Sequence, residues 1–372
     1  MTMQDQKSRR LRITRFQRPH TENEEERGAE PNKKDALNEP PPPKALQVIT
    51  YLYGFWLIAL VALGYLGTDI FWWGAYNQYL PQWVWGVPVL VLLVWFWKSY
   101  RQGTWLPCLM LLWVIFPVMD FRWSMHNTNL KGVSGTHLRV LTYNVKNGHY
   151  GQEEMTRNIQ EAHADIILLQ QSHGTYKDSL AKFLQGWNTQ VVNQYVFATK
   201  YPILEAELRD LSVSTIRIHA LRCRLKIKER VVTVYTVHLL SPRSGLNALR
   251  NRSERFLERM MDNNQVRQIQ AIRLGNYLKQ EFGPVLLAGD LNAPVQSMLY
   301  QEMTDSNLYN AFNAAGRGYG YTFGHISPAR HDFVRIDHIF LSREWVTLDC
   351  WTGSPVGSDH RPLIADLFLP DR

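Results

Sequence analysis

The first third of the chain is a polar segment followed by long apolar runs. Residues 1–44 have almost no apolar periodicity and include four consecutive prolines, which predicts a disordered basic and Pro-rich tail. Three uncharged runs follow, and Lys98 and Arg101 are the only charges between the second and the third. A bilayer core takes about 20 apolar residues as a helix. The pattern therefore predicts about three transmembrane helices, at residues 45–67, 80–97 and 103–119.

Tryptophan use and charge support a membrane segment. Ten of the 13 tryptophans lie between Trp56 and Trp123, where they cluster near the ends of the runs. The second and third runs are also short enough to be buried helices of a soluble domain, but the first is too long for that. The basic tail predicts a cytoplasmic N-terminus and, with an odd number of spans, an extracytoplasmic C-terminal domain. We therefore expect a multi-pass protein of the inner or plasma membrane.

The remaining residues, 137–372, alternate between strand-like and helical patterns. Apolar runs bounded by polar turns predict eight strands, and apolar side chains at helical spacing predict helices at residues 153–162 and 264–280. The strands are expected at residues 138–143, 165–170, 221–227, 231–238, 285–288, 336–341, 345–351 and 362–369. Strands mixed with helices indicate an α/β domain. Two of the strands, 221–227 and 231–238, follow each other so closely that we expect a hairpin.

Composition excludes two classes of protein and leaves nucleic-acid binding open. An apolar fraction of 45% is too high for a chain disordered throughout, and three cysteines are too few for a disulfide-stapled miniprotein. The formal charge is +8, but residues 137–372 carry only a modest +4 of it, with 27 Lys and Arg against 23 Asp and Glu. Charge alone therefore does not indicate a nucleic-acid ligand for this domain.

Polar side chains recur at the ends of the predicted strands, which is where an α/β sheet places its ligands. Each is unremarkable alone, since a Gly-Asp-x-Asn segment is most often a turn and an Asp-His pair is more often structural than catalytic. Together they form an ordered set along the chain: Asn144, Gln170-Gln171, His238, Gly289-Asp290-Leu291-Asn292, Arg335-Ile336-Asp337 and Ser358-Asp359-His360.

These motifs resemble the endonuclease/exonuclease/phosphatase superfamily, which has the DNase I-like fold. The most specific matches are residues 289–292 and 358–360, with residues 335–339 between them, and Tyr143-Asn144-Val145 is similar to the first family motif. The resemblance spans residues 138–369 and, with the apolar runs, resembles membrane-anchored bacterial members. It implies a four-layer αββα sandwich and hydrolysis of a phosphodiester or phosphomonoester that depends on Mg²⁺ or Mn²⁺.

The resemblance also implies a role for each matching residue. Asp290 would orient or deprotonate the attacking water, and Asn292 and His238 would contact the phosphate. His360, oriented by Asp337, would contact a phosphoryl oxygen. The implied metal ligands are Asn144, Gln171 and Asp359. These residue types suit phosphoryl transfer, which needs positioning and charge neutralisation above all.

The chain departs from the family pattern at one metal ligand. The family places Glu at the end of the second strand, whereas this chain has Gln171, which keeps an oxygen donor but loses the charge. Lys146 would weaken metal binding further if its side chain points inward. Two functions therefore stay open: a membrane-anchored phosphoesterase, and a pseudoenzyme or binding module on the same fold. The expected partners are the lipid bilayer and a phosphate ester, whether lipid headgroup, nucleic acid or small molecule.

Overall fold

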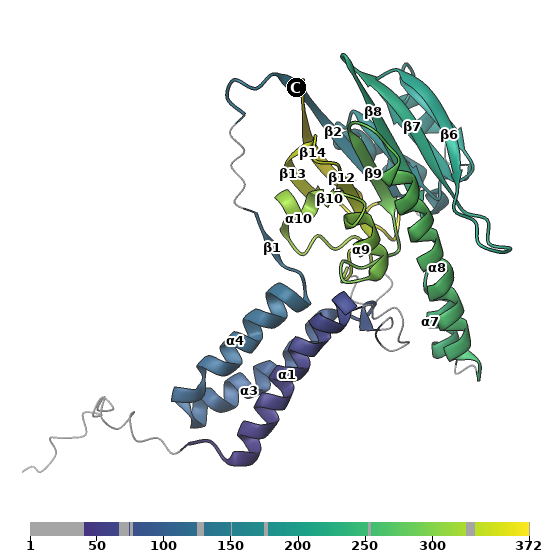
Figure 1. Cartoon of the computed structure of the whole chain (residues 1–372). Helices are drawn as coiled ribbons and strands as arrows, with labels where there is room; N and C mark the ends of the chain where they lie inside the picture. Colours follow the sequence, from purple (N-terminus) through teal and green to yellow (C-terminus); the bar gives the residue numbers. More distant parts are fainter. Residues whose placement is uncertain are drawn as a thin grey trace, which may run out of the picture.

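The computed structural model describes residues 41–66, 74, 77–124, 130–149, 151–174, 178–251, 254–324 and 332–371. The predicted disordered tail, apart from its last residues, lies outside them. The described chain forms a small bundle of helices followed by a larger α/β unit (Figure 1). The bundle consists of α1 (Lys44–Leu66), the 3-10 turn η3 (Gln82–Trp85), α3 (Gly86–Ser99), the 3-10 turn η4 (Arg101–Gly103), α4 (Trp105–Trp113) and the π-helical turn η5 (Val114–Val118).

Only one described helix is long and apolar enough to cross a membrane. It is Lys44–Gly64, with 21 residues and a mean hydropathy of 1.9. The helix α3 has 14 residues and α4 has nine, so at 1.5 Å per residue neither reaches across a hydrocarbon core of about 30 Å. The prediction of about three transmembrane helices is therefore not supported. It took each uncharged run as one helix, whereas turns interrupt the second and third runs.

The α/β unit contains two six-stranded mixed sheets, and one of them holds most of the later strands. Its order is β10-β12-β9-β8-β7-β6, with β8 parallel to β9 and the other pairs antiparallel. The predicted hairpin is formed by β7 and β8. The strands of this sheet are β6 (Ile203–Asp210), β7 (His219–Ile227), β8 (Arg230–His238), β9 (Val285–Asp290), β10 (Tyr309–Asn310) and β12 (Asp337–Leu341).

The second sheet contains the first strand of the domain and the last. Its order is β13-β14-β2-β3-β5-β4, with β2 parallel to β3 and the other pairs antiparallel. The sequence pattern missed β4, β5, β6 and β10; β4 and β6 are half-exposed and polar, and β10 has only two residues. The strands are β2 (Gly135–Asn144), β3 (Ile166–Gln170), β4 (Asn188–Val192), β5 (Tyr195–Thr199), β13 (Val346–Thr352) and β14 (Leu363–Pro370).

Helices cover the outer faces of both sheets. On the first sheet, Leu274 of α8 packs with Tyr235 and Leu287; on the second, Ile159 of α5 packs with Leu141. The layers are therefore α, β, β, α, as predicted. The helices are α5 (Gln152–Glu161), α6 (Asp178–Phe183), α7 (Arg243–Arg250), α8 (Phe256–Lys279), α9 (Met298–Thr304) and α10 (Ala311–Ala315). A short 3-10 turn, η6 (Lys146–Gly148), and a ribbon of β1 (Arg122–Trp123) with β11 (Arg317–Gly318) complete the described elements.

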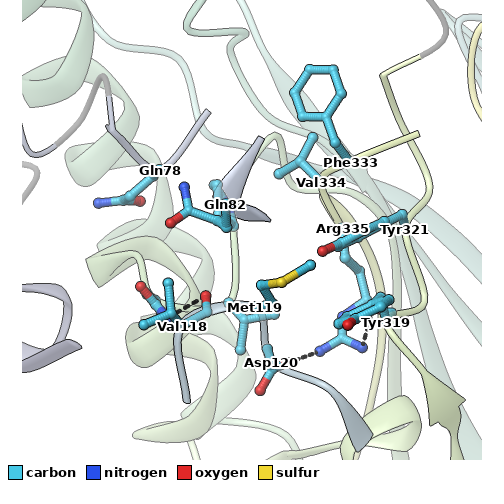
Figure 2. A pocket seen from close by; sticks show the side chains of 13 residues that line it. Gln78, Gln82, Val118, Met119, Asp120, Tyr319, Tyr321, Phe333, Val334 and Arg335 are labelled. Carbon is cyan, nitrogen blue, oxygen red and sulfur yellow. Dashed lines mark hydrogen bonds and ion pairs between the residues drawn. The ribbon is translucent and has the colours of Figure 1, made fainter. Parts of the chain in front are cut away.

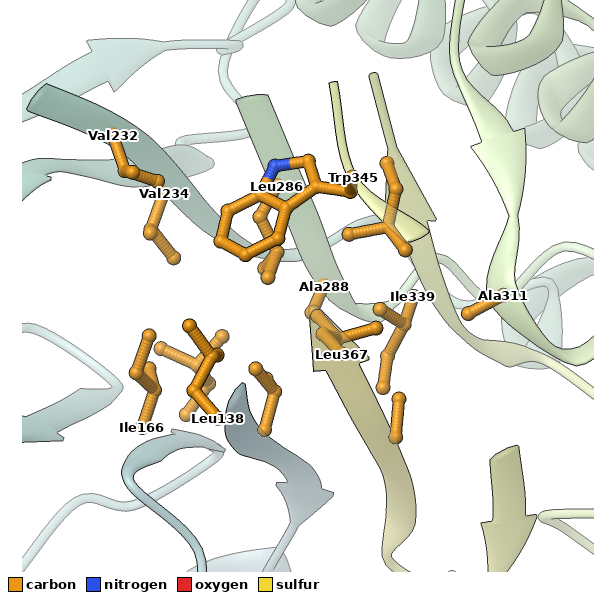
Figure 3. Packing of buried hydrophobic residues seen from close by; sticks show 14 of the residues in the cluster. Leu138, Ile166, Val232, Val234, Leu286, Ala288, Ala311, Ile339, Trp345 and Leu367 are labelled. Carbon is orange, nitrogen blue, oxygen red and sulfur yellow. The ribbon is translucent and has the colours of Figure 1, made fainter. Parts of the chain in front are cut away.

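The main core lies between the sheets (Figure 3). Leu138 and Ile166 face Val234, Leu286 and their neighbours across it. Because side chains alternate along a strand, the intervening residues of the same strands face the helices instead. Both faces of the central strands are thus buried, which explains their nearly continuous apolar sequences.

Strand register brings the predicted polar residues to one edge. Asn144 lies beside Gln170 where the parallel strands β2 and β3 end, and His238 lies beside Asp290 where β8 and β9 end. Asp337 begins the antiparallel strand β12 opposite Asp290. The strands end at a common edge, so their terminal side chains meet there.

The helical bundle docks beside this edge. Gln296 donates from Nε2 to the carbonyl oxygen of Pro117 at 3.0 Å, and Gln301 donates to that of Gly64 at 3.2 Å. Arg335 of the sandwich pairs with Asp120, which follows the bundle. Figure 2 shows this pair at the wall of a cavity of about 50 Å³ between the two parts.

Candidate active site

A cavity of about 460 Å³ opens where the strands end. Its lining combines the polar strand-end residues with a few apolar side chains such as Leu246 and Phe323. Among the lining residues are seven of the eight sites predicted from the sequence: Asn144, Gln171, His238, Asp290, Asn292, Asp359 and His360. The eighth, Asp337, lies directly behind His360. The structure therefore brings the eight residues together, while their individual roles remain predictions.

Asp290 is at the centre of the polar network and is almost fully buried. Its Oδ2 accepts a hydrogen bond from Asn144 Nδ2 at 2.8 Å, and its Oδ1 accepts one from the Asn292 backbone N–H at 2.8 Å. His238 Nε2 and His360 Nε2 lie 3.6 Å and 3.8 Å from Oδ2. Burial, reinforced by the nearby Asp337 carboxylate, raises the pKa of Asp290 above its ordinary value. A raised pKa suits a carboxylate that takes a proton during a reaction.

His360 and Asp337 form a buried pair. The His360 Nδ1 atom lies 2.8 Å from Asp337 Oδ2. Burial alone would lower the pKa of His360, but the Asp337 and Asp290 carboxylates outweigh it and raise that pKa to about 9. At neutral pH the ring is therefore a cation whose Nε2–H is directed at the cavity beside Asp290.

His238 has the opposite character. Burial lowers its pKa, despite the opposing effect of Asp290, so the ring is neutral near pH 7. Its Nδ1 lies 2.6 Å from Gln194 Oε1, which fixes the ring orientation. Sequence reasoning missed Gln194, because it lies in the turn between β4 and β5, two strands that the pattern did not reveal.

Asn292 is held by two residues that sequence reasoning also missed. Its backbone is in the left-handed region, with φ of 50°. Its carbonyl oxygen accepts hydrogen bonds from Tyr79 Oη at 2.6 Å and from Arg267 Nη2 at 2.5 Å. Arg267 also donates to Tyr79 Oη at 2.7 Å. Because Tyr79 lies just before η3, the helical bundle contributes directly to the support of the site. No local motif marks such long-range partners.

The predicted metal ligands do not suit a divalent cation as they stand. Asn144 Oδ1 accepts the Lys146 backbone N–H at 3.1 Å, and the Asp359 carboxylate pairs with the Lys146 ammonium. Gln171 lines the cavity but is neutral. A hard divalent cation prefers several anionic oxygens, and this set has one carboxylate, which is already paired. Separately, Asp290, Asp337 and His360 offer ligand atoms within 4.8 Å of one another, and such a group could bind a metal ion.

Comparisons with known proteins agree with the motifs and the fold. A model of the Endonuclease/Exonuclease/phosphatase family matches residues 141–360, more than half of the chain. The chain belongs to the endonuclease/exonuclease/phosphatase family. Family members are generally hydrolases that act on phosphate esters, and they usually use divalent metals. A search among curated proteins finds no match.

Solved structures of the family share the fold at low identity. A family protein from Bacteroides vulgatus is 20% identical with a TM-score of 0.50, over 63% of this chain and 99% of the other. One from Bacteroides thetaiotaomicron is 17% identical with a TM-score of 0.50, over 64% and 100%. A mannosyl-6-phosphatase from the same species is 17% identical with a TM-score of 0.48, over 62% and 99%. At these identities the likeness concerns the fold alone.

Proposed function

We propose that this chain hydrolyses phosphate esters in the cavity at the strand ends. The observation that carries the proposal is the pairing of two buried groups of opposite character: Asp290 Oδ2 lies 3.8 Å from Nε2 of the cationic His360. One group can accept a proton from water while the other donates a hydrogen bond to a phosphoryl oxygen. Asn292 lines the cavity beside them as a phosphate contact. His238, neutral and with its Nδ1–H on Gln194 Oε1, would have to take up a proton at Nε2 to donate to a phosphate oxygen.

The proposed reaction balances with these groups. Asp290 takes a proton as the water oxygen bonds to phosphorus, and the P–O bond to the leaving group breaks. The leaving oxygen keeps the bonding electron pair and receives a proton from solvent, and Asp290 then returns its own proton to solvent. The products are an alcohol and a phosphate or, from a diester, a phosphomonoester. His360 neutralises charge that builds on the phosphoryl oxygens, oriented by Asp337. The predicted Mg²⁺ or Mn²⁺ has no step in this scheme, because the predicted ligand set suits it poorly.

A binding module without catalysis is the second candidate, and Gln171 is the observation that favours it. Against it stands the intact network around Asp290, whose hydrogen bonds and paired histidines a non-catalytic site would not need. The test is to purify the full chain in detergent micelles and to assay bis(p-nitrophenyl) phosphate and p-nitrophenyl phosphate. Turnover supports the hydrolase. Tight binding of either probe or of inorganic phosphate without turnover supports the binding module.

We also propose that α1 anchors the chain in a lipid bilayer. Most of the exposed large apolar side chains among the described residues lie on the bundle, such as Phe55, Val91 and Trp113. On the same side of the sandwich, α7 and the start of α8 project outward (Figure 1) and expose Leu257 and Met261 among arginines. That composition is typical of helices that lie at a membrane surface. The substrate would then be reached at the membrane, where a lipid headgroup is the nearest phosphate ester.

Topology follows from the charge ahead of α1. The basic tail favours a cytoplasmic N-terminus, so a single crossing by α1 places the sandwich outside the cytoplasm. A phosphatase reporter fused after Arg372 is expected to be active and a cytoplasm-only fluorescent reporter dark. The same reporters fused ahead of Lys44 should give the opposite pattern. Equal fluorescence from both fusions, in a chain that washes off membranes with carbonate, would contradict the anchor.

The rate of hydrolysis should depend on pH through Asp290 and His360. Activity needs ionised Asp290 and cationic His360. It should therefore fall as pH drops below the pKa of Asp290, which lies above the ordinary Asp value, and again as pH rises past about 9, the pKa of His360. The raised pKa of His360 also stabilises the fold. That contribution is fully present below about pH 6.5 and is lost as pH rises through about 9. The measurement is kcat/KM against pH for wild type and Asp337→Asn. The variant should move the alkaline limb to lower pH, and an unmoved limb would contradict the assignment.

A further inference from the structure

The turn after β2 directs a lysine into the cavity at a cost in backbone conformation. Lys146 and Asn147 have φ of 43° and 58°, and Gln171, across from them, has φ of 48°. Non-glycine residues avoid this left-handed region, and where it occurs the surrounding contacts must hold it. Here the Lys146 N–H donates to Asn144 Oδ1, and the Asn147 N–H donates to the Gln171 carbonyl oxygen at 2.6 Å. The turn is therefore held by hydrogen bonds to the strand ends of the site.

The lysine ammonium lies among the predicted metal ligands. Its Nζ pairs with a carboxylate oxygen of Asp359, a side chain that is 5% exposed and adjacent to His360. Lys146 itself is 28% exposed and lines the cavity together with Asn144 and Gln171. The positive charge among the predicted metal ligands is therefore supplied by a side chain of the protein.

We propose that the Lys146 ammonium is the cation of this site, binding a non-bridging phosphate oxygen and neutralising the charge that a divalent metal neutralises in other family members. This proposal rests on the proposed hydrolysis at the same site. Phosphoryl transfer needs neutralisation of charge on the phosphate oxygens, and lysine serves as a point charge for phosphate. Placing a divalent cation beside an ammonium and a neutral Gln171 would be opposed by charge repulsion. In the other candidate group, Asp290, Asp337 and His360, the His360 ring is already paired with Asp337. Hydrolysis should therefore proceed without added metal.

The ion pair has a simpler reading, a salt bridge that only stabilises the fold. A partly buried ion pair is weak evidence for stability, and a purely structural pair requires neither a strained turn nor a place in the cavity wall. Lys146 has both features, with Asp359 holding the ammonium beside His360. The two interpretations differ in whether substitution of Lys146 weakens phosphate binding.

The test uses the full chain in detergent micelles with bis(p-nitrophenyl) phosphate as the probe. Wild-type turnover should be unchanged by EDTA or by added Mg²⁺. Lys146→Gln should lower kcat/KM by on the order of 10²–10³, as loss of a charge-stabilising donor does. Lys146→Arg keeps the charge and should lose much less. Lys182→Ala, which removes an exposed lysine on α6, is the matched control and should behave as wild type.

Calorimetry supplies a readout that does not depend on turnover. Mg²⁺ should give no binding heat with wild type, whereas the Lys146→Gln/Gln171→Glu double variant, which removes the ammonium and adds a carboxylate, should bind Mg²⁺. Inorganic phosphate should bind wild type at least tenfold more tightly than Lys146→Gln. Wild-type activity that EDTA abolishes and Mg²⁺ restores would overturn the proposal.

Failure of the proposed function is distinguishable from failure of this inference. If no protein turns over any probe, the hydrolase proposal fails, and phosphate binding still reports on the lysine. Weakened phosphate binding in Lys146→Gln, with melting unchanged and Lys146→Arg retaining affinity, would then support the ammonium as the phosphate-binding cation. Equal affinity of wild type, Lys146→Gln and Lys146→Arg for inorganic phosphate would contradict this role of the ammonium.

Discussion

Replacing Asp290 with Asn is expected to lower kcat/KM for a phosphodiester by on the order of 10³, since general-base catalysis contributes roughly 10²–10⁴. The amide cannot take a proton from water. Asn144 Nδ2 and the Asn292 N–H both donate to the carboxylate, so the amide also places a donor against one of them. The chemistry and the alignment of the phosphate contacts should therefore both suffer.

The thermal stability of Asp290→Asn, unlike its activity, should not fall. The raised pKa of Asp290 means that the folded state disfavours its ionised form, so a neutral amide relieves that cost at neutral pH. A site that sacrifices stability for activity behaves in this way. The donor that the amide places against Asn144 or Asn292 opposes this gain, so thermal melting should give a Tm close to that of wild type. Asp305→Asn, at an exposed position that ends α9, is the control and should change neither quantity. Retention of more than a tenth of wild-type turnover by Asp290→Asn would refute its role as the base.

Replacing Arg267 with Met is expected to have the largest effect on stability. The guanidinium is fully buried and donates to the carbonyl oxygens of Leu240 and Asn292 at 3.0 Å and 2.5 Å. Its removal leaves the Leu240 carbonyl oxygen without that donor, and each buried acceptor left unsatisfied costs about 1–3 kcal/mol. We expect the free energy of unfolding to fall by about 2–4 kcal/mol in all, which is in the upper range for single substitutions.

The activity of Arg267→Met should fall together with its stability, because Arg267 helps to hold Asn292. A loss of about tenfold in kcat/KM at a temperature where the variant is folded would show that the buried arginine positions the phosphate contact. Arg259→Met, exposed on the same helix, is the matched control and should leave melting and turnover as in wild type. Tyr79→Phe removes only the hydroxyl and should give a smaller loss in the same direction. Unchanged melting in Arg267→Met would contradict a structural role for the cation.

Much of the sandwich and the outline of the site were predictable because their signals are local. Continuous apolar runs marked central strands buried on both faces, such as β3 and β9. The hairpin of β7 and β8 was also confirmed. The polar residues that end these strands, Asp290 among them, could be expected at one edge because parallel strands end on the same side.

Some elements were missed because their signals depend on what surrounds them. The edge strand β4 is polar and half-exposed, so no period-2 apolar pattern marks it. The three uncharged runs near the N-terminus shared one composition, yet among the helices that the structure describes only α1 is long enough to span a bilayer. Helix length there depends on turns between the runs, which composition does not reveal.

Periodicity and the residues at strand ends were enough to predict the central strands, the edge at which the site lies and the residue types that meet there. Which groups touch one another depended on the folded structure. In the folded chain Gln194 contacts His238, Tyr79 and Arg267 donate hydrogen bonds to Asn292, and Lys146 pairs with Asp359. These partners are far apart along the chain: Tyr79 and Asn292 are separated by 213 residues, and their contact forms only once the bundle docks beside the packed sheets.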